Sequence, residues 1–87
     1  MNLYAYVLMG YDDEIIGGYS SVKSAYRDGL KQINKPNMAV HYVHEGQLKK
    51  ISLSEVRMYF KDRTKGVLKM TAGRRVVAKI MKCPFLS

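Results

Sequence analysis

Two stretches decide the fold: residues 20–31, S-S-V-K-S-A-Y-R-D-G-L-K, and residues 54–65, S-E-V-R-M-Y-F-K-D-R-T-K. They align without a gap, and in both copies apolar residues recur at helical spacing while cations recur at every fourth position. Residues at that spacing share one face of an α-helix, so each copy predicts an amphipathic helix with a basic stripe. The first stripe consists of Lys23, Arg27 and Lys31, and the second stripe of Arg57, Lys61 and Lys65.

The first predicted helix follows two short strands. Residues 3–9 are rich in aromatic and branched side chains, which is typical of a buried strand. Residues 14–16 form a second strand, which Gly17-Gly18 is expected to break. Gly29 falls within the apolar face of the helix, where the missing side chain would allow close packing against the sheet.

The same plan recurs in the next part of the chain. Residues 38–44 alternate apolar and polar side chains, as a half-buried strand does, and residues 47–51 return after a turn at Glu45-Gly46. Ser52 and Glu55 stand three apart and form a predicted capping box at the start of the second helix.

The last segment has two interpretations. Residues 67–71 and 75–82 predict a β-hairpin with its turn at Ala72-Gly73-Arg74, because β-branched residues alternate on either side of a glycine turn. The apolar positions after the turn also suit one face of a helix, which is the competing prediction.

The predicted fold class is α+β, an antiparallel sheet with two helices on one face in the order ββα-ββα-ββ. Eighty-seven residues give one domain, residues 1–87, with no room for a second core. It divides into two predicted repeat units, about residues 3–35 and 38–65, and a C-terminal hairpin, residues 66–83. A chain of this length is marginally stable, which favours a homodimer.

The charge of the chain is high and unevenly distributed. Fifteen Lys and Arg against seven Asp and Glu give +8. Residues 1–22 hold three acids and no Lys or Arg, for −3, and residues 23–87 hold all fifteen cations and four acids, for +11. Such a field attracts polyanions, and nucleic acid is the commonest partner. The alternative is a lysine-rich surface that serves only solubility.

The sequence predicts neither a leader peptide nor a membrane span. It contains no run of 18 apolar residues, and its opening lacks a basic segment and a small-residue cleavage site. The single cysteine, Cys83, excludes an internal disulfide, which suits a reducing compartment. We therefore expect a cytoplasmic protein with no membrane partner.

The tyrosines have two interpretations as well. Tyr4 and Tyr6 share one face of the first strand, so they would lie on the open side of the sheet, or at a dimer interface, if the helices cover the Leu3 side. There they would serve as stacking platforms for unpaired bases. The other candidates for stacking are Tyr11, Tyr19 and Tyr42.

Two histidines are the candidates for catalytic residues. His41 and His44 stand three apart on a predicted strand, so alternation points them to opposite faces. His44 beside Glu45, with Lys49 and Lys50 across the hairpin, offers the acid, base and cations of a small endoribonuclease. Because no cysteine pair or third histidine completes a zinc set, we predict no metal and no cofactor, and our first interpretation of the chain is non-enzymatic.

The segment Val7-Leu8-Met9-Gly10-Tyr11, an apolar strand ending in Met-Gly-aromatic, resembles the start of small host-takeover proteins of T4-like phages. This group includes antitoxin-like inhibitors of host toxin–antitoxin defence, and the many Tyr, Lys and Met residues are similar in style. The resemblance implies a phage-encoded factor that blocks a host ribonuclease toxin in the host cytoplasm. It provides no catalytic residue to transfer.

These observations predict a non-enzymatic RNA-binding protein. The two stripes would contact phosphates, and the cations of the last hairpin would extend the patch if that hairpin lies beside the second helix. The predicted RNA-binding residues are Lys23, Arg27, Lys31, Arg57, Lys61, Lys65, Lys69, Arg74, Arg75 and Lys79. The first alternative is a protein inhibitor whose basic face docks on an acidic host protein, and the second is the endoribonuclease. Single-stranded and duplex RNA remain equally open as targets.

Overall fold

The computed structural model describes residues 4–33, 40–62, 65–73 and 75–84. Its elements follow the order ββα-ββα-ββ, which confirms the predicted α+β fold class. They are β1 (Tyr4–Gly10), β2 (Ile15–Tyr19), α1 (Val22–Ile33), β3 (Val40–His44), β4 (Gln47–Lys50), α2 (Leu53–Lys61), β5 (Val67–Ala72) and β6 (Arg75–Pro84).

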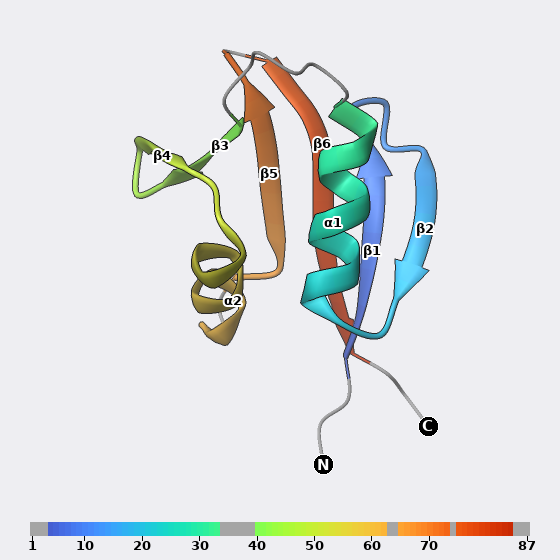
Figure 1. The fold of residues 1–87 in the computed structure, drawn as a ribbon. Helices are drawn as coiled ribbons and strands as arrows, with labels where there is room; N and C mark the ends of the chain where they lie inside the picture. The colour runs from blue at the N-terminus through green and yellow to red at the C-terminus, as the bar shows by residue number, and fades with distance from the viewer. Residues whose placement is uncertain (1–3, 34–39, 63–64, 74, 85–87) are drawn as a thin grey trace.

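The strands form one antiparallel sheet in the order β2-β1-β6-β5-β3-β4 (Figure 1). The last hairpin, β5–β6, therefore occupies the middle of the sheet, and the earlier hairpins β1–β2 and β3–β4 flank it. β6 pairs with β1 from Tyr4 opposite Pro84 to Gly10 opposite Ala78. The predicted hairpin is correct, and the competing helix over the last segment is wrong.

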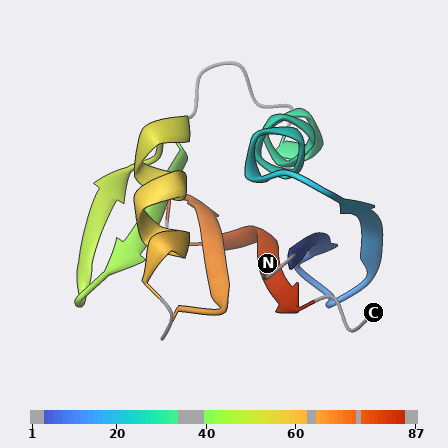
Figure 2. The same cartoon turned by 90° about the horizontal axis from the view of Figure 1, so that it is seen from below.

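Both helices lie on the same face of the sheet (Figure 2). Alternation along the strands sends one set of side chains toward them, and the core between the two layers is apolar. Its fully buried large side chains are Leu8, Leu68, Met70, Ile80 and Val56.

Gly29 has the close packing predicted for it. A Cβ atom at this position would lie 3.0 Å from Met70 Sδ and 3.3 Å from Leu8 Cδ1. The bare backbone of α1 therefore approaches the strands beneath it, where a larger side chain would push the helix away from the sheet.

Short-range sequence signals define the turn and the start of the helix in the second ββα unit. Glu45 and Gly46 both have positive φ angles, 53° and 78°, which matches a two-residue hairpin turn of the type that favours glycine. The Ser52 side chain accepts from the Glu55 backbone N–H at 3.3 Å and caps the first turn of α2. The predicted turn is confirmed. Of the predicted capping box, the Ser52 half is confirmed, whereas the Glu55 side chain accepts from the Tyr42 hydroxyl.

Two predicted details are wrong. Gly17 and Gly18 do not break the second strand but lie within β2, which runs to Tyr19. As an edge strand, β2 pairs only with β1, so it accommodates extended glycines that pack no side chain. Tyr6 faces the helices rather than the open side of the sheet, because the alternation of β1 follows the buried Leu8, and its ring packs 5.6 Å from that of Phe60.

The internal repeat stays a prediction. The strand order reads the same from either edge when the two ββα units are exchanged and β5 is exchanged with β6. However, α1 has twelve residues and α2 has nine. Lys65 follows the end of α2, whereas its aligned counterpart Lys31 lies within α1.

Candidate nucleic-acid interface

Five of the predicted RNA-binding residues lie together on the helix layer. All five side chains are exposed, and none of them contributes to the core. We call them the helix cations: Lys23, Arg27 and Lys31 on α1, and Arg57 and Lys61 on α2.

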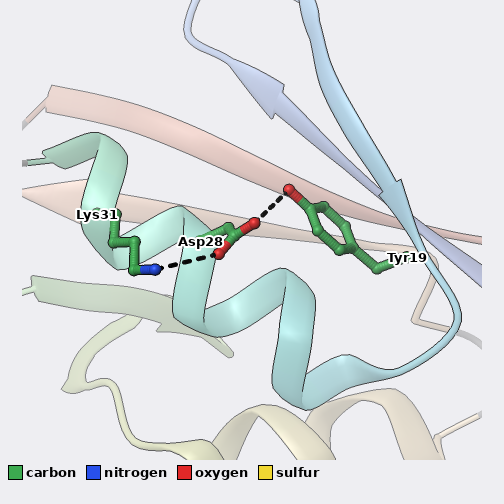
Figure 3. Close-up of polar contacts among 3 residues, drawn as sticks. All are labelled: Tyr19, Asp28 and Lys31. Carbon is green, nitrogen blue, oxygen red and sulfur yellow. Dashed lines mark hydrogen bonds and ion pairs between the residues drawn. The ribbon is translucent and has the colours of Figure 1, made fainter.

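The acid of α1 is bound to a tyrosine of the sheet. The Tyr19 hydroxyl, from β2, donates a hydrogen bond to Asp28 Oδ2 at 2.8 Å (Figure 3). Lys31 Nζ lies 3.9 Å from the other carboxylate oxygen. The hydrogen bond to Asp28 is the main reason why the pKa of Tyr19 is raised, since the carboxylate favours the protonated phenol.

The acid of α2 has an equivalent arrangement on the other side of the molecule. The Tyr42 hydroxyl, from β3, donates to Glu55 Oε2 at 3.0 Å. Burial is the main cause of the raised pKa of Tyr42, and the contact with Glu55 raises it further. Asp28 and Glu55 are thus each held on the flank of their helix that faces the nearer outer strands.

The same helical geometry directs most of the helix cations away from the tyrosine-bound acids. Successive residues of an α-helix are separated by about 100°, so Lys23 and Arg27 point away from Asp28, and Arg57 and Lys61 point away from Glu55. Lys31 lies one turn from Asp28 and contacts it. Asp28 contacts β2 and Glu55 contacts β3, at opposite sides of the sheet, and the helix cations lie on the exposed surface of the helix layer.

The helix cations are poorly compensated. Among the described residues, only Lys31 of this set has a carboxylate oxygen within 4 Å, that of Asp28. Exposed like charges on one layer with few acidic partners give a positive potential. This arrangement can attract an extended polyanion.

The other predicted cations do not all join this surface. α2 ends at Lys61 because Asp62 is extended (φ −74°, ψ 118°), so Lys65 is not part of a helical stripe and lies half-buried beyond the helix. Arg75 is exposed at the start of β6. Arg74 lies outside the described residues.

Lys69 and Lys79 lie on the opposite face of the sheet. Lys69 alternates with Leu68 and Met70, which are buried beneath the helices, so its side chain points away from them. Lys79 is its cross-strand partner and forms an ion pair with Asp13. The last hairpin lies under the helices rather than beside α2, so these two lysines do not extend the patch formed by the helix cations.

A pocket of about 270 Å³ opens between the β3–β4 hairpin and the flank of α2 opposite to its cations. Three rings form one group in its wall, with centroids 6.0 Å apart for Tyr42 and Tyr59, 6.4 Å for His44 and Tyr59, and 6.3 Å for Tyr42 and His44. The pocket is lined by Tyr42, His44, Lys49, Glu55, Met58, Tyr59, Asp62 and Lys65.

The residues that surround His44 differ from those predicted to act with it in an endoribonuclease. Lys49 is the cross-strand partner of Tyr42 and lies on its side of the sheet, whereas Lys50 pairs with His41 on the opposite side. Glu45 is an exposed turn residue, so the carboxylates near His44 come from α2 instead. The register of the hairpin, which a two-residue turn fixes, was the signal that could have placed His44 and Lys49 on one face.

Metal ligands, membrane-spanning helices and similarity to known proteins give this surface no further functional assignment. Within the described part of the chain, no three His, Cys, Asp or Glu side chains gather as a metal ion would require. Neither described helix is long and apolar enough to cross a membrane. Comparisons with protein-family models, curated proteins and solved structures find no match to this chain.

Proposed function

We propose that the protein is a non-enzymatic RNA-binding module that holds the phosphate backbone on the helix cations. The observation that carries this proposal is the arrangement of the two helices. Asp28 and Glu55 are engaged by Tyr19 and Tyr42, and the five cations of the two helices are exposed on the helix layer. Lysine and arginine that neutralise phosphates provide affinity largely independent of sequence.

The resemblance to host-takeover proteins of T4-like phages adds the biological setting. In this proposal the protein acts in the host cytoplasm and blocks a host ribonuclease toxin by binding its RNA, or the toxin and its RNA together. A homodimer remains part of the proposal, because a chain of 87 residues has a small core.

The test is the affinity for a short single-stranded RNA measured over a range of salt concentrations. Five phosphate contacts predict a slope of log K against log salt near about −3.5. The double variant Arg57→Ala/Lys61→Ala removes two contacts, so the slope should fall to about −2 and the affinity by roughly 20-fold at about 0.1 M salt.

The matched control is Lys50→Ala/Lys69→Ala. It removes the same charge from exposed positions on the other face of the sheet, and its slope should equal that of the unchanged protein. Equal effects of the two double variants would contradict the interface, because they would show that only net charge matters. If the protein binds no RNA at low salt, the proposal fails and the alternative, docking of the basic face on an acidic host protein, takes its place.

A further inference from the structure

The walls of the pocket beside α2 are suited to a flat ring. Tyr42, Tyr59 and His44 pack edge to face or tilted, so a further ring can stack on the half-buried Tyr59 or His44. Met58 lines the same pocket with 64% of its surface exposed, and its flexible thioether side chain adapts to aromatic surfaces. Such walls are typical of sites that accept an unpaired base.

The charged groups of the pocket suit the remainder of a nucleotide. Among the described residues, neither the Lys49 nor the Lys65 ammonium group has a carboxylate oxygen within 4 Å. Both therefore remain available for a phosphate. Glu55 accepts from Tyr42 through Oε2, and a carboxylate has further capacity to accept from an amino group of a base.

We infer that this pocket binds one unpaired nucleotide, with its base against Tyr59, His44 and Met58 and its phosphate held by Lys49 and Lys65. The inference rests on the proposed function only in its choice of a nucleotide as ligand. It adds a second point of contact on the other flank of α2.

Met58 connects the two surfaces. On α2 it lies between the flank that carries Arg57 and Lys61 and the flank that carries Glu55. An RNA strand whose phosphates lie on the helix cations would cross the exposed Met58 and insert one nucleotide under the β3–β4 hairpin. The protein would then prefer single-stranded RNA over duplex, because a paired base cannot enter the pocket.

The two histidines permit a test with an internal control. His44 lines the pocket, whereas His41 lies on the opposite side of the sheet opposite Thr71. Titration with cytidine 5′-monophosphate, followed by NMR of the histidine ring protons, should shift the signal of His44 and leave that of His41 in place. Cytidine and inorganic phosphate, each added alone, should bind more weakly than the nucleotide.

The variants Lys49→Ala and Lys50→Ala form a matched pair of adjacent residues with the same change of charge. Lys49→Ala should lower the affinity for the nucleotide at least about fivefold, and Lys50→Ala by less than about twofold. Equal effects of the two variants, equal shifts of both histidines or no shift would overturn the inference. Because the free nucleotide needs none of the helix cations, failure here would leave RNA binding by those cations intact, and loss of RNA binding would leave this test valid.

Discussion

At the level of single residues, tyrosines connect the sheet to the acids of the helices and make stability sensitive to alkaline pH. The pKa is raised for Tyr6, Tyr26, Tyr42 and Tyr59 chiefly by burial, and for Tyr19 chiefly by its hydrogen bond to Asp28. Below about pH 10 these phenols are protonated in both the folded and the unfolded chain, so they add no pH dependence. As the pH rises further, the unfolded chain loses these protons first, and the free energy of unfolding decreases.

We therefore expect stability in urea to fall steadily above about pH 10, as measured by far-UV circular dichroism, with the tyrosine absorbance change shifted to higher pH than in the unfolded chain. The double variant Tyr19→Phe/Tyr42→Phe should show a shallower decline, because two of the shifted groups are gone. An identical decline in both proteins would contradict this account of the two hydroxyls.

At the level of elements, Lys82 of β6 binds the C-terminal turn of α2. Its ammonium group donates to the Phe60 carbonyl at 2.8 Å, in the last turn of the helix, where carbonyls lack partners within the helix. The same group lies 4.1 Å from the centroid of the Tyr4 ring. A helix end, the central strand and the first strand thus meet at one cation.

Replacement of this cation should therefore destabilise the fold. Lys82→Met should lower the free energy of unfolding by about 1–2 kcal/mol, since it leaves the carbonyl without its charged donor. Lys69→Met, at an exposed position on the other face, should change it by less than about 0.5 kcal/mol. If Lys82→Met and Lys69→Met lower the free energy of unfolding in urea equally, Lys82 contributes to stability only through its charge.

The element order could be predicted from the sequence, because each element has a local signal. Periodic apolar residues mark α1 and α2, and Glu45-Gly46 marks a turn that needs positive φ. The strand order could not be predicted, because pairing between β1 and β6 joins residues about 75 positions apart and leaves no local pattern. The stripe of α1 and the first two cations of the second stripe were visible in the sequence, but the contacts of Tyr19 and Tyr42 with the acids of the helices join distant residues and were not.

At the level of the whole molecule, the exposed helix cations should make stability depend on anions. Their mutual repulsion opposes folding, and a polyanion that binds only the folded chain removes this repulsion and shifts the equilibrium further. Heparin at low salt should therefore raise the melting temperature by several degrees. The increase should be smaller in Arg57→Ala/Lys61→Ala than in Lys50→Ala/Lys69→Ala, and the reverse order would place the anion on the open face of the sheet.

The central position of β6 has a consequence for the order of assembly. During vectorial synthesis on the ribosome, both ββα units emerge before the strand that joins β1 to β5. Until β6 inserts, β1 and β5 each expose an unpaired edge toward the missing strand, and such edges are prone to pair with other chains. The nascent chain therefore cannot complete its sheet cotranslationally unit by unit, and its final step is the closure of a gap in the middle.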